Sequence, residues 1–311
     1  MLVKNIETIK KYAIVNYNFS FQVIESQLRK QERKHILSVI GRELYNSWSD
    51  ADPEEETEKE VFDLLQEASA NLALLSYTKV GIVSSSDGGL HISMSQNSKP
   101  AEWWQIKDLR VELLNSGLEA IDQALELMEA NQSKFESWTN SDQYTIFKEL
   151  LCSQTAHFQN YYDISKSRLT FLALRPFLRK VEKQFFEGLL GAETLLQIKE
   201  GNSAEEKKAL ETARWAQVSL SIAEIAKEGI FELSSRGLFT VFEEIPGMNR
   251  TKADQVELLK LEQSKTNEGN EILKDLVRHL KKFPQIFQDY DQRENQKITN
   301  PVINGKSIVS F

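Results

Sequence analysis

The chain has 311 residues, a formal net charge of −8 at pH 7 and one cysteine. This length suits two domains of ordinary size. A single cysteine excludes an internal disulfide framework, and the acidic balance argues against a protein whose main role is to grip nucleic-acid phosphates. The sequence has no run of eighteen apolar residues and no secretory pattern at its start, so we expect no association with a membrane.

A short helix is expected within 1–16, followed by a long amphipathic helix over 21–43. Apolar side chains in the second segment recur at steps of three and four, which places them on one helix face. They are Phe21, Ile24, Leu28, Ile36, Val39 and Ile40. The opposite face alternates basic and acidic residues, as a solvated face does. The segment 45–52, which contains Trp48, is expected to be a loop.

A second helix is expected over 53–79, because Asp52-Pro53-Glu54-Glu55 has the pattern of a capping box. After this helix the apolar period changes from 3.6 to 2, and Asp87-Gly88-Gly89 provides turn residues. The segment 81–92 therefore predicts a β-hairpin. A third helix is expected to begin near Pro100.

The same series occurs again about 150 positions later. The segment 171–193 matches 21–43 without a gap, as Leu178-Arg179-Lys180 matches Leu28-Arg29-Lys30. A capping box at Ser203 to Glu206 then opens a helix over 204–227, and 229–240 again predicts a hairpin. The expected fold class is mainly α: a tandem duplication of a helical bundle domain, each copy carrying a small β-hairpin.

The duplication divides the chain into four parts. We expect a first helical repeat over 1–138, a linker over 139–150 that is rich in polar residues, and a second repeat over 151–290. The remaining segment, 291–311, has no helical face. It is either a frayed tail or an extended arm that adds an edge strand to a neighbouring subunit.

A search for catalytic chemistry finds no complete set of residues. Glu32 and His35 have the Glu-x-x-His spacing of di-iron bundles, but the second copy has Phe185 where His35 stands, so the required pair is missing. Cys152 and His157 are five positions apart, off a common helix face. We therefore expect no enzyme, no catalytic residue, no cofactor and no metal.

Aromatic and apolar residues outside the helical cores are candidates for an interface. Adjacent helix positions point about 100° apart, so one of Trp103 and Trp104 is expected to be buried and the other to lie between the copies or at a subunit interface. Tyr161 and Tyr162 invite the same interpretation. The candidate interface residues are Trp103, Trp104, Tyr161, Tyr162, Ile303, Ile308, Val309 and Phe311.

Several stretches resemble an uncharacterised family that is associated with phages and prophages of Bacteroides-type bacteria. They are Ser86-Asp87-Gly88-Gly89-Leu90-His91-Ile92, Tyr161-Tyr162-Asp163-Ile164 and Ser167-Arg168-Leu169-Thr170-Phe171-Leu172-Ala173-Leu174-Arg175-Pro176. The resemblance covers most of 17–200. It implies a virion structural protein at the head–tail junction, and it carries over no catalytic residues.

The resemblance and the duplication together suggest a head–tail connector (adaptor) subunit that forms a ring between portal and tail. Its expected partners are other copies of itself, the portal and tail proteins of the virion, and DNA that passes through the lumen without sequence-specific binding. Its expected location is the virion, after assembly in the bacterial cytoplasm. The alternative is a non-catalytic cytoplasmic binding or scaffold protein that uses the groove between its two helical repeats.

Overall fold

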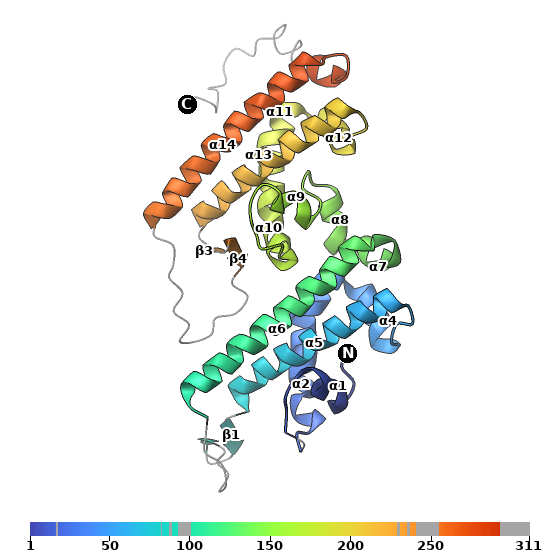
Figure 1. Cartoon of the computed structure of the whole chain (residues 1–311), viewed down its shortest axis with the longest axis vertical. Coiled ribbons are helices and arrows are strands. Elements are labelled where there is room, and N and C mark those ends of the chain that lie inside the picture. Colours follow the sequence, from blue (N-terminus) through green and yellow to red (C-terminus); the bar gives the residue numbers. More distant parts are fainter. Residues whose placement is uncertain are drawn as a thin grey trace. The chain divides into compact units, whose positions relative to one another are not determined.

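The computed structural model describes residues 1–16, 18–81, 83–86, 89–92, 101–228, 231–234, 237–240 and 255–292. These residues form two compact units, which are described separately (Figure 1). Unit 1 consists mainly of Met1–Phe147, and Ser167–Leu169 groups with it. Unit 2 contains Lys148–Lys166, Thr170–Thr240 and the helix that follows at 255.

Unit 1 is built mainly from helices, with a π-helical turn inside the second one. Its elements are α1 (Ile6–Tyr12), α2 (Phe21–Gln31), the π-helical turn Glu32–Ile36, α3 (Leu37–Ile40), α4 (Arg42–Asp50), α5 (Glu56–Val80), β1 (Val83–Ser86), β2 (Gly89–Ile92), α6 (Trp103–Ala130), the 3₁₀ turn Gln132–Lys134, α7 (Glu136–Thr139) and α8 (Asp142–Lys148).

Unit 2 follows the same order. Its elements are α9 (Thr155–Gln159), α10 (Arg168–Val181), the π-helical turn Glu182–Glu187, α11 (Gly188–Leu190), α12 (Ala192–Glu200), α13 (Ala204–Glu228), β3 (Phe231–Ser234), β4 (Gly237–Thr240) and α14 (Gln255–Lys282). The lengths agree closely: α5 and α13 each have 25 residues, and α6 and α14 each have 28. This agreement is consistent with a helical architecture of two repeats.

The expected fold class needs a correction, because the hairpins are not a part of the architecture of the helical domains. The protein folds mainly as helices, and its class is mainly α. β1 pairs only with β2 and β3 only with β4, over four residues each, and neither ladder gains a third strand within the described part of the chain. An isolated two-stranded ladder is marginally stable in water, so it cannot act as a structural layer.

The expected single helix over 21–43 is also wrong, because Gly41 breaks it. Gly41 has φ +82°, and Gly191 has φ +84° at the matching place in unit 2. Residues other than glycine rarely adopt this conformation. The segment 45–52 is not a loop, because α4 covers most of it. Trp48 on α4 is buried, with ring centroids 5.9 Å from Phe62 and 6.3 Å from Phe135 in edge-on contacts.

Of the two predicted capping boxes, the structure contains the one in unit 2 but not the one in unit 1. Helix α5 begins at Glu56 rather than near Pro53, and the carboxylate of Glu55 accepts the Glu58 backbone N–H at 3.0 Å as its N-cap. In unit 2 the prediction is confirmed. The Ser203 N–H donates to the Glu206 carboxylate at 2.7 Å, and the Glu206 N–H donates to the Ser203 hydroxyl at 3.2 Å.

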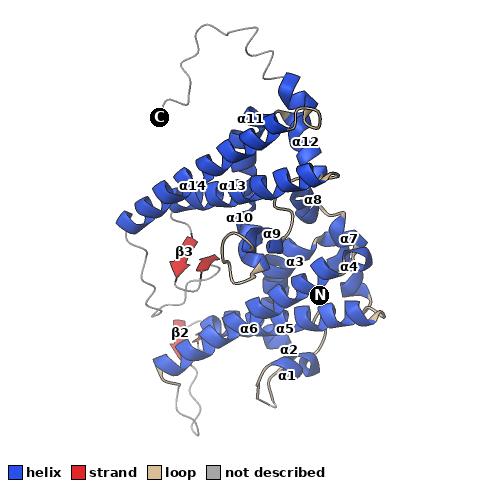
Figure 2. Ribbon diagram, turned by 45° about the horizontal axis from the view of Figure 1, so that its top comes forward, coloured by secondary structure: helices blue, strands red, loops and turns tan. Residues whose placement is uncertain are grey.

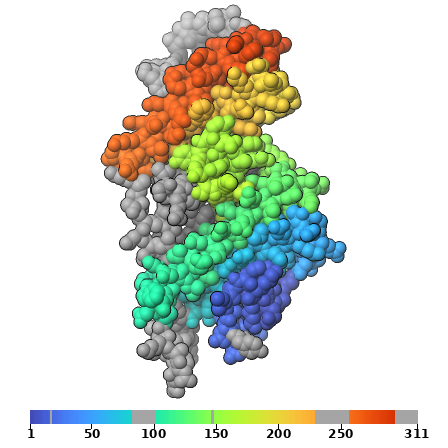
Figure 3. All heavy atoms as spheres, in the orientation of Figure 1, coloured from blue at the N-terminus to red at the C-terminus, as the bar shows by residue number. Residues whose placement is uncertain are grey.

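Each unit is organised around one antiparallel pair of long helices: α5 with α6, and α13 with α14 (Figures 1 and 2). The side chains of α5 and α6 form a continuous surface in the space-filling view (Figure 3). In unit 2 the core brings together residues from the π-helical turn, the short helices and this pair. Its members include Phe186, Leu190, Leu220, Leu276 and Phe287.

The boundary between the units at Phe147 falls within the range 139–150, which we expect to be a linker. Much of that range is helical, since α8 occupies Asp142–Lys148.

Candidate functional site

A polar site of unit 1 surrounds the buried carboxylate of Glu32, at the start of the π-helical turn. Glu32 is fully buried and accepts the backbone N–H of Leu2 at 3.1 Å and that of Val3 at 3.3 Å. The hydroxyls of Tyr45 and Ser69 also donate to it, at 2.7 and 2.8 Å. The carboxylate therefore joins the N-terminal segment to α4 and α5.

Unit 2 repeats this arrangement around Glu182, which is also buried at the start of a π-helical turn. Glu182 accepts the backbone N–H of Leu151 at 2.9 Å and the side-chain amide of Gln217 at 3.0 Å. The ammonium group of Lys199 on α12 forms an ion pair with it. Gln217 and Ser69 occupy equivalent positions of α13 and α5.

A second side chain in each unit completes the capture of the same backbone residue. Gln66 donates its amide to the Leu2 carbonyl at 3.0 Å, and Arg214 donates to the Leu151 carbonyl at 2.8 Å. Both the N–H and the C=O of one leucine are thus bound by side chains. We call each arrangement a carboxylate clamp. Because a buried charge needs several donors to offset its desolvation, each clamp fixes the path of the chain entering its unit.

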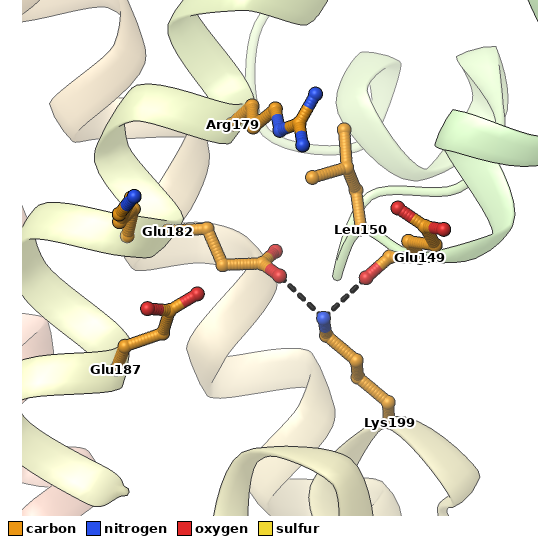
Figure 4. A pocket seen from close by; sticks show the side chains of 7 residues that line it. Glu149, Leu150, Arg179, Glu182, Glu187 and Lys199 are labelled. Carbon is orange, nitrogen blue, oxygen red and sulfur yellow. Dashed lines mark hydrogen bonds and ion pairs between the residues drawn. The ribbon is translucent and has the colours of Figure 1, made fainter. Parts of the chain in front are cut away.

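A pocket of about 270 Å³ opens beside the clamp of unit 2 (Figure 4). It is lined by Glu149, Leu150, Arg179, Glu182, Lys183, Glu187 and Lys199. Figure 4 shows Lys199 reaching between Glu182 and the Glu149 carbonyl, and it donates to both. Three acidic and three basic side chains balance each other here, so the pocket has no net formal charge with which to select a charged ligand.

The cysteine and histidine singled out in the sequence have unreactive surroundings. Burial raises the pKa of the Cys152 thiol to about 12, so it stays protonated at neutral pH. Burial, and then the charge of Arg214, lower the pKa of His157 to about 4. His157 lies 3.3 Å from the Ser153 hydroxyl through Nδ1.

Within the part of the chain that the structure describes, no group of three or more His, Cys, Asp or Glu residues could hold a metal ion. His35 is buried and belongs to the π-helical turn that begins at Glu32. No helix among the described residues is long and apolar enough to cross a membrane.

The expectation that one of Trp103 and Trp104 is buried is wrong. Both lie at the start of α6, and their exposed fractions are 52% and 60%. Arg110 lies about two turns after Trp103 on α6. Its guanidinium is 5.8 Å from the Trp103 ring centroid and donates to the Thr78 carbonyl at 2.9 Å. The start of α6 therefore anchors the end of α5 through Arg110 and leaves both indoles exposed.

Tyr161 and Tyr162 lie after α9 and are half-buried. The Tyr161 ring stacks on Trp215 of α13 with centroids 6.1 Å apart and planes 12° apart. Lys265 of α14 lies 5.7 Å from the Tyr162 ring centroid. The Trp215 indole donates to Glu268 at 3.0 Å and is still 44% exposed.

The remaining candidates, Ile303, Ile308, Val309 and Phe311, lie outside the described residues, as does the expected arm 291–311 from residue 293 on. Sequence reasoning missed the roles of Glu32, Glu182 and Trp215. The first two had a signal: Glu32 sits four residues after Leu28 and four before Ile36, on the apolar helix face, and Glu182 repeats this placement.

No curated protein and no solved structure matches the chain. A family model does match, in two regions that fall one in each half of the repeated element series: residues 36–148 and 177–300. These regions cover most of the sequence. The chain belongs to DUF6712, a family of unknown function.

Proposed function

We propose that the protein is a structural subunit of a phage virion: a head–tail connector (adaptor) that forms a ring between portal and tail. The observation that carries the proposal is the exposure of Trp103, Trp104 and Trp215 on long, well-packed helices. Tryptophan is enriched among the residues that dominate binding at protein interfaces. Three exposed indoles on rigid helices suit a protein that acts by contact with other proteins.

The resemblance to a phage-associated family provides the biological context. The clamps support a structural role, because their buried groups are engaged in holding the backbone. The net charge of −8 suits a lumen through which DNA passes, since acidic walls repel a polyanion and limit sticking.

The test is the assembly state of the purified full chain. Sedimentation velocity and negative-stain microscopy should show closed rings of uniform size. Copies of the protein should also co-purify with portal protein and appear in intact particles by mass spectrometry. A strictly monomeric protein that is absent from particles would refute the proposal.

A further inference from the structure

The two units provide an internal control for each other. They share a backbone course, so an exposed side chain that is present in one unit and replaced in the other is not required by the fold. Residues of α5 and α13 correspond at an offset of 148, and those of α2 and α10 at an offset of 150. Two surfaces differ in their side chains between unit 1 and unit 2.

The first surface is on unit 2 and consists of Tyr161, Trp215, Glu211 and Glu268; we call it the aromatic platform. Three contacts hold its rings in place. Tyr161 stacks on Trp215, the Tyr161 hydroxyl donates to the Glu211 carbonyl at 3.1 Å, and the Trp215 indole donates to Glu268. Because these contacts fix the indole while much of it stays exposed, it is already ordered for a partner.

Unit 1 folds without this stack. Glu67 stands where unit 2 has Trp215, and Asp63 stands where unit 2 has Glu211. The Tyr12 ring has the Lys11 ammonium 4.8 Å from its centroid, and Lys11 pairs with Asp63 at 3.0 Å. An ordinary surface ion pair thus suffices at this position, so the shared backbone course does not require an indole there.

The second surface is on unit 1 and consists of Lys30, Arg33 and Lys34; we call it the basic face. All three side chains are exposed, and with Ser26 they line a hollow of about 370 Å³. They lie at the end of α2 and on the π-helical turn that follows.

Unit 2 neutralises part of the equivalent face. Lys180, the counterpart of Lys30, pairs with Glu224 at 2.7 Å and Glu228 at 3.7 Å. Unit 1 has Ser76 and Val80 at the positions of these two glutamates. In addition, Gln184 stands where unit 1 has Lys34. Lys183, the counterpart of Arg33, is exposed and keeps its charge. Unit 2 therefore retains only part of the positive charge that the three side chains of the basic face give unit 1.

We propose that the basic face of one copy docks on the aromatic platform of a second copy. This inference rests on the proposed ring-forming function and assigns the surfaces that build the ring. A guanidinium or ammonium group packs well on the face of an indole, and the carboxylate of Glu211 complements the remaining positive charge. Glu268 is already paired with Lys265 at 2.6 Å. Because the two surfaces differ and lie on different units, the contact is heterologous. Repetition of such a contact gives a ring when the rotation from one copy to the next closes, and an open filament when it does not.

The decisive experiment is a charge exchange measured by sedimentation velocity over a range of protein concentrations. Arg33→Glu and Glu211→Lys should each weaken association by about tenfold or more, because each places like charges together. The double variant R33E/E211K restores opposite charges at every contact and should recover most of the association. Trp215→Ala should weaken association by about tenfold or more without recovery.

Matched controls come from the other unit. Lys183→Glu changes the counterpart of Arg33, and Glu67→Ala changes the counterpart of Trp215; both should leave association unchanged. Circular dichroism establishes that each variant is folded. If the wild type forms rings and the platform and basic-face variants form them equally well, this docking contact is wrong while the ring function stands. If the folded wild type is monomeric throughout, the docking contact is wrong, and if it is also absent from particles the proposed function is wrong as well.

Discussion

Gly117 of α6 lies directly against Leu72 of α5: a Cβ atom on Gly117 would come within 2.7 Å of the Leu72 Cγ atom. Unit 2 has the same relationship, since a Cβ on Gly269 would come within 2.6 Å of the Leu220 Cγ atom. These glycines permit close approach of the two long helices on which each unit is built. Both are in helices, so their role is spatial rather than conformational.

Gly117→Ala and Gly269→Ala should therefore each destabilise the protein by about 1–3 kcal/mol, because the added methyl group overpacks the helix contact. Urea denaturation followed by circular dichroism measures the change. Gly188→Ala is the matched control. Gly188 is helical, with nothing within 4 Å of its built Cβ, so alanine should stabilise by about 0.4–1 kcal/mol. Equal effects at all three glycines would contradict the close-contact argument.

Glu182→Gln should destabilise unit 2 by about 3 kcal/mol, because it removes the charge that the Lys199 ammonium and the Leu151 N–H bind in a buried site. Lys199→Met should cost less, since backbone and amide donors to Glu182 remain. The double variant E182Q/K199M should lose less stability than the sum of the two single variants, because the residues share one interaction.

Glu187→Gln serves as the control for the clamp variants. Glu187 lines the same pocket but is exposed, so its substitution should change stability by less than about 0.5 kcal/mol. Strict additivity in the E182Q/K199M cycle, measured by the same urea denaturation, would show that the ion pair does not couple these residues.

His157 should make the protein less stable in mild acid. Burial lowers the pKa of His157 from 6.5 to about 4 in the folded state, so the unfolded chain binds a proton in this range and the folded chain does not. Stability from this group is therefore complete above about pH 6.5 and is lost as pH falls towards 4. Because His157 is only half-buried, we expect a loss of about 1–2 kcal/mol.

The comparison of wild type with His157→Gln isolates this contribution. Denaturation midpoints measured between about pH 7 and pH 4 should fall less steeply for the variant than for the wild type. Parallel pH profiles for the two proteins would show that His157 titrates in the folded state as it does in the unfolded chain.

Cys152 should resist thiol reagents while the protein is folded. Its pKa is raised from 9.0 to about 12 by burial, which lowers the thiolate fraction about 1000-fold, and the thiolate is the reactive form. Labelling with a chromogenic disulfide at about pH 8 should be at least that much slower in the native protein than in guanidinium chloride. Rapid labelling of the native protein at the rate of an exposed cysteine would contradict the burial of Cys152.

The sequence anticipated those features that depend on neighbours a few residues apart. The capping box from Ser203 to Glu206 is one, because its two hydrogen bonds join residues three positions apart. The amphipathic periodicity of 21–43 is another, although the Gly41 break and the π-helical turn are local events that periodicity alone does not reveal. The repeat could be recognised in the sequence because it is a recurring pattern of residue types.

Only the tertiary structure decided which residues that are distant in sequence come into contact. Glu32 accepts hydrogen bonds from Leu2, thirty positions away, and from Ser69, thirty-seven positions away. No local sequence pattern predicts these contacts. Trp48, Trp104 and Trp215 are the same residue type, but helix packing buries Trp48 and leaves Trp104 and Trp215 exposed. Burial is a property of the assembled helices rather than of a residue, so the amino-acid sequence determined the helices, and their packing decided which side chains remained available for contact.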